Sequence, residues 1–111
     1  MIGIIVPAHN EEAVVAQCIE SLLIAGEHPA LAGEEVCVVI VLDQCTDGTQ
    51  RVVSRYPVQS LDVSHCNVGR TRAAGAEHML GQGARWLAFT DADTVVPATW
   101  LVDQLRFRTD A

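Results

Sequence analysis

The sequence predicts an α/β fold, a Rossmann-like parallel sheet of about four strands with alternating helices. Continuous β-branched runs, typical of strands buried on both faces of a parallel sheet, open the chain and recur before its middle. Between the expected strands, the apolar residues have the spacing of helices. A helix that connects two parallel strands of one sheet forms a right-handed crossover, so we expect crossovers of this hand. The 111 residues suffice for one domain around a single core.

The first half of the chain contains the clearest elements. A strand is predicted at residues 2–6, where a β-branched run is closed by Pro7. A helix is predicted at residues 12–25, because its apolar residues recur at the spacing of one helical stripe. The strongest strand signal is the unbroken apolar run at residues 36–42, which stops at Asp43. These segments predict the first strand, the first helix and the central strand.

The second half repeats the alternation with weaker signals. A helix should begin near Thr46 or Asp47, whose side chains can accept a hydrogen bond from a free N–H of the first turn, and end before Pro57. A strand follows, then a turn at residues 67–69 and an Ala-rich helix, then a strand and a helix that begins with Pro97. These elements are expected at residues 58–63, from the turn to residue 80, at 86–90 and at 97–107.

Composition excludes several classes of partner and location. The net charge is −7 and all seven basic residues are arginines, which excludes non-specific binding to nucleic acid or to anionic membranes. The longest apolar run is far shorter than the roughly 20 residues of a membrane span. The N-terminus lacks the basic start and cleavage site of a signal peptide, so we expect a cytoplasmic chain. Its four cysteines, without a Cys-x-x-Cys pair, are expected as reduced thiols and not as zinc ligands.

Polar segments follow every predicted strand. They lie at residues 7–12, 43–49, 65–72 and 91–94. The carboxyl ends of parallel strands meet at one edge of the sheet, and ligands of such sheets bind in the crevice at that edge. The sequence therefore predicts a ligand site built from these four segments.

Asp91 and Asp93 are the strongest candidates for a metal site. If the strand geometry persists, residues two apart project to the same side, and two carboxylates can hold one Mg²⁺ or Mn²⁺ that also binds phosphate oxygens. The alternative is an acidic cluster at the start of the helix that follows Pro97, where negative charge is stabilising.

Other polar residues at this edge have two interpretations. Asp43 either forms a turn or accepts N–H groups of a ligand. Arg72, or in competition Arg70, either contacts a phosphate or base or is solvated on a helix. His9 and His65 are expected to be hydrogen-bonded loop residues. The sequence contains no Walker A loop, no Gly-x-Gly-x-x-Gly after the first strand and no Gly-x-Ser-x-Gly.

Four segments of the sequence together resemble the nucleotide-binding half of the inverting family 2 glycosyltransferases, which have the GT-A fold. They read IIVPAHNEE, VVIVLDQCTDGT, NVGRTRAAG and FTDADTVVP, in the order of that family. In the family, the first segment cradles the nucleotide, the acid that ends the second strand contacts the base, and the Asp-x-Asp pair binds the metal that holds the sugar diphosphate. The resemblance therefore implies a nucleotide-sugar site.

Carried over residue by residue, the resemblance implies nucleotide-binding residues and metal ligands. The nucleotide-binding residues are Pro7, Ala8, Asn10, Glu12, Asp43, Arg72 and Asp91, and the metal ligands are Asp91 and Asp93. The implied cofactor is Mg²⁺ or Mn²⁺, and the implied donor is a UDP- or GDP-linked sugar. The reaction implied is glycosyl transfer to an acceptor hydroxyl that the sequence does not identify.

The sequence departs from the family in its length. After the donor-binding half, family members continue with an acceptor site, a general base and a Gln-x-x-Arg-Trp motif, and none of these parts follows Ala111 in this sequence. We therefore expect residues 1–111 to form a nucleotide-sugar-binding domain without the acceptor half, with the base beyond Ala111 and no transfer activity of its own. Apolar surface left by the missing half would favour a partner or a homo-oligomer.

Two alternatives remain open. One is a non-catalytic nucleotide-binding or assembly module. The other is a sugar-phosphate nucleotidyltransferase, which would need a Gly-rich loop with Arg or Lys where this chain has residues 7–12.

Overall fold

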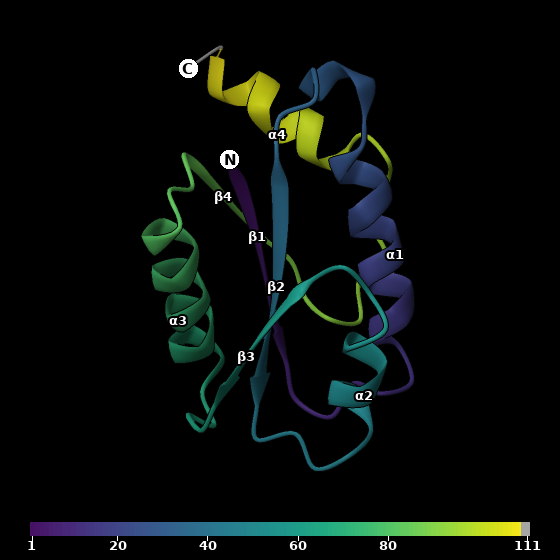
Figure 1. Cartoon of the computed structure of the whole chain (residues 1–111), viewed down its shortest axis with the longest axis vertical. Coiled ribbons are helices and arrows are strands. Elements are labelled where there is room, and N and C mark those ends of the chain that lie inside the picture. Colours follow the sequence, from purple (N-terminus) through teal and green to yellow (C-terminus); the bar gives the residue numbers. More distant parts are fainter. Residues whose placement is uncertain (110–111) are drawn as a thin grey trace.

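A parallel sheet of four strands forms the centre of the molecule, in the order β3-β2-β1-β4 (Figure 1). The computed structural model describes residues 1–109, and side chains as far as Arg106. The strands are β1 (Ile2–Ala8), β2 (Val36–Asp43), β3 (Gln59–Val63) and β4 (Trp86–Phe89). All three strand pairings are parallel, and β1 pairs with β2 from Ile2 opposite Val36 to Ala8 opposite Leu42.

Helices cover both faces of this sheet. They are α1 (Val15–Gly26), the short 3-10 helix η1 (Pro29–Leu31), α2 (Thr49–Val53), α3 (Val68–Gly81) and α4 (Trp100–Thr109). In Figure 1, α3 lies on one side of the sheet and α1 and α2 lie on the other, while α4 crosses the top of the view. Leu101 and Val102 of α4 belong to the same core cluster as the buried residues of α1. The predicted α/β class with a four-stranded parallel sheet is confirmed.

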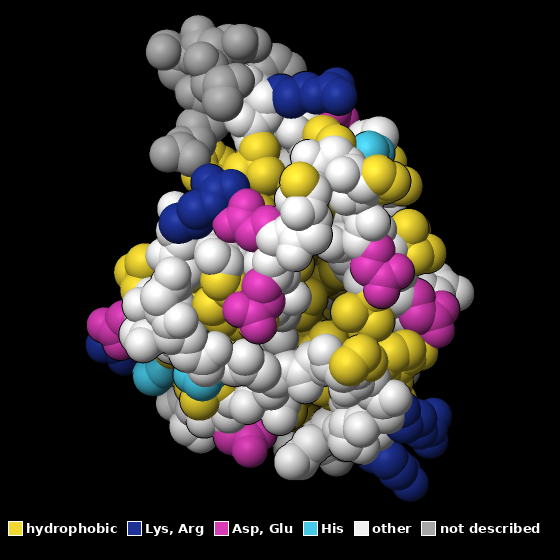
Figure 2. Space-filling view, turned by 45° about the horizontal axis from the view of Figure 1, so that its top comes forward, with side chains coloured by type: hydrophobic (Ala, Val, Ile, Leu, Met, Phe, Trp, Pro, Cys, Tyr) yellow, Lys and Arg dark blue, Asp and Glu magenta, His cyan; other side chains and the backbone are white. Residues whose placement is uncertain are grey.

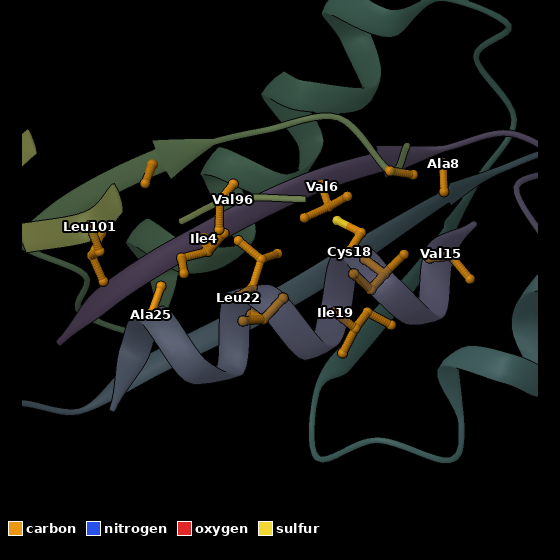
Figure 3. Packing of buried hydrophobic residues seen from close by; sticks show 14 of the residues in the cluster. Ile4, Val6, Ala8, Val15, Cys18, Ile19, Leu22, Ala25, Val96 and Leu101 are labelled. Carbon is orange, nitrogen blue, oxygen red and sulfur yellow. The ribbon is translucent and has the colours of Figure 1, made fainter. Parts of the chain in front are cut away.

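The larger part of the core lies between the sheet and α1. Successive side chains of a strand point to opposite faces, so alternate residues of β1 face α1. Figure 3 shows one of them, Val6, beside Cys18 and near Leu22 of α1, with Val96 and Leu101 from the C-terminal segment in the same cluster. Four of these five side chains are fully buried. The cluster joins α1 to the segment that follows β4.

A smaller core lies between the sheet and α3. It contains Ile5, Val39, Val41 and Met79. Gly75 lets α3 approach the sheet closely, because a Cβ at this position would lie 2.5 Å from Cγ2 of Ile5. The close approach fixes α3 over the centre of the sheet.

Three predicted boundaries are wrong, the first because of strand pairing and the other two because a separate turn precedes the helix. β1 does not stop before Pro7 but continues to Ala8, because β1 pairs with β4 only as far as Phe89 and the missing N–H of the proline costs no ladder bond there. α1 begins at Val15 and not at residue 12, because a separate turn starts at Glu11. In this turn, the main-chain carbonyl of Glu11 accepts hydrogen bonds from the N–H groups of Val14 and Val15.

The last helix also begins later than predicted. Pro97 accepts a hydrogen bond from the N–H of Trp100 in a turn, and α4 starts at Trp100. The residues before it form a loop that leads from β4 to α4 past the end of α1 (Figure 1). Within residues 1–109, no helix combines the length and apolar character needed to cross a membrane.

The face of the molecule in Figure 2 shows acidic side chains spread across the surface and basic side chains at its periphery. This distribution agrees with the net charge of −7. A negatively charged ligand would therefore need local cations to bind on this protein.

Candidate functional site

A cleft of about 490 Å³ lies at the carboxyl ends of the strands, where the sequence predicts a site. It is lined by residues from the ends of β1 and β2, from the start of α3 and from the loop between β4 and α4. Five of the predicted site residues line it together, namely Pro7, Ala8, Asp43, Asp91 and Asp93. Segments far apart in the sequence thus meet as the four polar segments predict.

Asp43 ends β2 and is buried at the bottom of this edge. Its Oδ1 accepts hydrogen bonds from the main-chain N–H groups of His65 (2.8 Å) and Cys66 (3.1 Å), and its Oδ2 from that of Asn67 (3.2 Å). The hydroxyl of Thr71 lies 2.9 Å from Oδ2. The carboxylate therefore holds the segment between β3 and α3 against β2.

These contacts also fix the charge of Asp43. Burial raises the pKa of this carboxyl, but the hydrogen bonds from the three N–H groups and from Thr71 outweigh burial and lower the pKa to about 2. A carboxylate has about four acceptor positions. The hydroxyl of Thr71 has one hydrogen, which it shares between Asp43 and the carbonyl of Asn67 at 2.8 Å. Asp43 is therefore ionised and retains one acceptor position at most for a ligand.

His9 adds a further link at the same place. Its Nδ1 lies 2.7 Å from the main-chain carbonyl of Asp43. A carbonyl only accepts, so Nδ1 carries the hydrogen of this bond. The prediction of a hydrogen-bonded loop residue is confirmed, although His9 also lines the cleft.

Asp91 and Asp93 lie at the other end of the cleft, in the loop after β4. Both side chains are exposed and Ala92 between them is buried, so the two carboxylates face the cleft from the same stretch of chain. Within the described part of the chain, the carboxylate of Asp93 makes no hydrogen bond or ion pair. Asp91 has one, to Arg72.

Helix α1 holds this loop from below. The buried thiol of Cys18 lies 3.5 Å from the main-chain carbonyl of Asp91, and the hydroxyl of Ser21 accepts a hydrogen bond from the N–H of Val96 at 3.1 Å. Burial, then the negative charges of Asp93 and Asp91, raise the pKa of the Cys18 thiol to about 11. The thiol therefore stays protonated and can donate to the carbonyl of Asp91.

Arg72, on α3, does not line the cleft but forms an ion pair with Asp91, which does. Its Nη2 is 3.0 Å from Oδ1 of Asp91, and both side chains are partly exposed. Arg72, a predicted nucleotide-binding residue, thus forms an ion pair with Asp91, a predicted metal ligand. The guanidinium of the competing candidate, Arg70, makes no hydrogen bond or ion pair within the described residues.

Asn10 and Glu12 point away from the cleft to the loop between β2 and α2. Oδ1 of Asn10 accepts hydrogen bonds from the N–H groups of Thr46 (2.8 Å) and Asp47 (3.3 Å). Oε1 of Glu12 accepts one from Gly48 (2.9 Å), and the N–H of Glu12 donates to Oδ2 of Asp47 (3.2 Å). These two residues therefore tie two loops of the site together and do not line it.

The structure adds cleft residues that the sequence does not single out. They are Glu11, Cys66, Asn67, Val68, Thr71 and Ala92. Thr71 is the most buried polar residue among them, and a signal for it was present: it lies four residues after the helix cap Asn67, on the same face of α3. Without knowledge of the sheet order, nothing indicated that this face meets Asp43.

The carboxylates of the cleft fit a hard divalent cation. Within the described residues, no group of three or more metal-ligating side chains is present. Mg²⁺ and ions like it are commonly bound through one or two carboxylates, with phosphate oxygens and water completing the coordination. Asp91 and Asp93 are two carboxylates that could hold such an ion, as the sequence predicts, and a phosphorylated ligand would supply the remainder.

Solved glycosyltransferases share this fold. TarS from S. aureus, residues 1–349 in complex with UDP-GlcNAc, aligns with a TM-score of 0.77 and 24% identity, over 98% of this chain and 31% of that 1–349 chain. Glucosyl-3-phosphoglycerate synthase from Mycobacterium tuberculosis, in complex with Mn²⁺, UDP and phosphoglyceric acid, aligns with a TM-score of 0.69 and 21% identity, over 95% and 38% of the two chains.

A third solved structure also has a fold similar to that of this chain. The mannosyltransferase PcManGT from Pyrobaculum calidifontis, in complex with GDP-Man and Mn²⁺, aligns with a TM-score of 0.67 and 23% identity, over 95% of this chain and 31% of that one. Comparison with curated protein sequences finds no significant match. The model of glycosyl transferase family 2 matches residues 3–109, and the chain therefore belongs to glycosyl transferase family 2.

Proposed function

We propose that this chain is the donor-binding part of a glycosyltransferase, which binds a UDP- or GDP-linked sugar with Mg²⁺ or Mn²⁺ for transfer to an acceptor hydroxyl. The observation that carries the proposal is the arrangement of the cleft. Two exposed carboxylates, Asp91 and Asp93, face it at one end, and the buried, ionised Asp43 lies at the other. Two carboxylates two residues apart in one loop can hold one divalent cation together with phosphate oxygens.

The two ends of the cleft suit the two ends of a nucleotide sugar. Asp43 only accepts hydrogen bonds, so its remaining acceptor position suits the N–H of uracil or guanine. A metal on Asp91 and Asp93 would bind the diphosphate, with Arg72 as a second cation beside it. Pro7 and Ala8 form the wall between the two ends.

Asn10 and Glu12 act in this proposal through the loops that they join. Their bonds to residues 46–48 hold the segment after β1 in place, and this segment carries His9 and Glu11 into the cleft. We therefore assign them a supporting role in nucleotide binding.

Three solved relatives support the choice of ligand. They are described in complex with UDP-GlcNAc, with Mn²⁺ and UDP, and with GDP-Man and Mn²⁺. This chain spans about a third of the chain in each of these three structures, and 19% of the longer TarS chain. We therefore place the acceptor site and the general base of the transfer outside residues 1–111.

In the complete reaction, the base would deprotonate the acceptor hydroxyl, which attacks the anomeric carbon of the sugar. When bound, the divalent ion would stabilise the departing diphosphate. The residues of this chain would hold the donor and orient it. Asp43 would stabilise the end of the cleft that binds the nucleobase, through its hydrogen bonds to residues 65–67.

Calorimetric titration of the chain with UDP and with GDP tests the proposal. We expect binding in the presence of Mn²⁺ and its loss with excess chelator. Asp93→Asn should abolish the metal-dependent binding, and Asp62→Asn should preserve it. Asp62 is an exposed residue of β3 outside the cleft, so this control makes the same change of charge. Equal heats with Mn²⁺ and with chelator would reject the metal role.

A further inference from the structure

Arg72 and Asp91 form an ion pair that a bound metal and a bound diphosphate would break, because the metal would bind Asp91 and the diphosphate would bind Arg72. Nη2 of Arg72 lies 3.0 Å from Oδ1 of Asp91, with 42% and 58% of the two side chains exposed. Asp93 makes no ion pair within the described residues. The guanidinium therefore neutralises one of the two carboxylates.

A divalent cation on this pair of carboxylates competes with the guanidinium. Both need the oxygens of Asp91, and arginine remains charged at every accessible pH, so the two cations repel each other. An ion pair with this much exposure is weak, which makes the exchange of one cation for the other inexpensive. The buried main chain beneath the pair does not have to move, because Cys18 and Ser21 of α1 hold the loop.

A freed guanidinium would lie beside the cleft in which the proposed diphosphate binds. Arg72 follows Thr71, which lines the cleft, so its side chain starts from the helix that borders the site. Two carboxylates and one divalent ion together carry no net charge, which leaves the charge of a diphosphate to be neutralised by another group. A guanidinium forms strong charge-assisted hydrogen bonds with phosphate oxygens.

We propose that Arg72 is an exchangeable cation: it occupies Asp91 in the ligand-free protein and passes to the diphosphate when a divalent ion takes its place. This inference rests on the proposed function. Metal and nucleotide then bind cooperatively, since the metal releases the guanidinium that the nucleotide needs. Arg72 opposes the metal alone and favours the nucleotide with the metal present.

Arg72 should lower the affinity for Mn²⁺ alone and raise the affinity for the nucleotide in the presence of Mn²⁺. These opposite effects distinguish the proposed exchange from a purely structural role of Arg72. In Arg72→Gln, the affinity for Mn²⁺ without nucleotide should rise about two- to fivefold, the range expected for loss of an exposed ion pair. The affinity for UDP at saturating Mn²⁺ should fall about tenfold, because one charge-assisted contact is lost. Damage to the fold would lower both affinities.

The experiment measures free Mn²⁺ by electron paramagnetic resonance and UDP binding by calorimetry, on the full 111-residue chain. Arg55→Gln is the control for net charge, because Arg55 is exposed after α2 and outside the cleft. It should leave the UDP affinity unchanged and change the Mn²⁺ affinity less than Arg72→Gln does. Arg72→Lys, which keeps the charge, should lie between Arg72→Gln and the wild type in both measurements.

Each result decides the matter. Normal binding of UDP with Mn²⁺ by the wild type, with an unchanged or weaker Mn²⁺ affinity in Arg72→Gln, overturns this inference alone. Failure of the wild type to bind Mn²⁺, with or without UDP, overturns the proposed function as well. A rise in Mn²⁺ affinity of equal size in Arg55→Gln reduces the effect to net charge and also overturns the inference.

Discussion

The hydroxyl of Ser21, on the buried face of α1, accepts a hydrogen bond from the main-chain N–H of Val96 at 3.1 Å. The same hydroxyl donates to the carbonyl of Cys18 at 2.7 Å, and the thiol of Cys18 lies 3.5 Å from the carbonyl of Asp91. Helix α1 is thereby attached at two points to the loop that carries Asp91 and Asp93. The position of both carboxylates depends on side chains that do not line the cleft.

Ser21→Ala is expected to destabilise the chain, because it leaves the buried N–H of Val96 without an acceptor. Such a loss costs about 1–3 kcal/mol in free energy of unfolding. Urea denaturation measures it. Ser60→Ala, at an exposed position of β3, should change the free energy by less than about 0.5 kcal/mol. Equal stabilities of the two variants would show that the Ser21 bond contributes nothing.

Asp43→Asn is expected to destabilise the chain at neutral pH. The amide keeps one acceptor oxygen, and its NH₂ group would face N–H donors among His65, Cys66 and Asn67. We expect a loss of about 2–3 kcal/mol, because hydrogen bonds to a charged group are lost. Asp62→Asn serves as the control in the same denaturation experiment. A variant as stable as the control would contradict the assignment of Asp43 as the anchor of the segment before α3.

The stabilising effect of Asp43 should depend on pH. Burial raises the pKa of this carboxyl, but the four hydrogen-bonding groups outweigh burial and lower the pKa to about 2 against the ordinary 3.8. A pKa depressed in the folded state means that the stabilisation is complete above the unfolded pKa and is lost as the pH falls toward the folded one. The difference in unfolding free energy between the wild type and Asp43→Asn should therefore shrink between about pH 4 and pH 2. A difference that stays constant over this range would be evidence against an ionised, hydrogen-bonded Asp43.

Selectivity for the nucleobase is a separate prediction for Asp43. Uracil and guanine offer an N–H at the position where cytosine offers a bare acceptor, and two facing acceptors cost on the order of 1–3 kcal/mol. With Mn²⁺ present, UDP or GDP should therefore bind roughly 5- to 150-fold more tightly than CDP. Competition calorimetry with the three nucleotides measures this ratio. Equal affinities would leave Asp43 with its structural role alone.

The chain alone is not expected to transfer sugar to ordinary acceptors. The cleft holds groups suited to the donor, and we place the general base outside residues 1–111. Chromatographic analysis of donor, product and free sugar after incubation with Mn²⁺ should show at most slow hydrolysis of the donor. Saturable transfer that disappears in Asp93→Ala would show that the chain is a complete enzyme.

Local signals in the sequence determined the fold class and the place of the site. The run at residues 36–42 is apolar without interruption and β-branched, which is typical of a strand covered on both faces, and it forms most of β2. Polar residues after each strand had to meet at one edge, since parallel strands end on the same side. Asp43, Asp91 and Asp93 therefore line one cleft, as the sequence predicted.

Contacts between segments far apart in the chain decided the rest. The helical pattern from residue 12 did not reveal that Glu12 would precede α1 and that its side chain would accept a hydrogen bond from Gly48 instead of lining the cleft. The pairs Arg72 with Asp91 and Ser21 with Val96 are equally invisible in the sequence, because each joins residues on different elements. Periodicity shows which face of an element is buried, whereas the order and register of the strands set which side chains meet, and that information exists only in the folded chain.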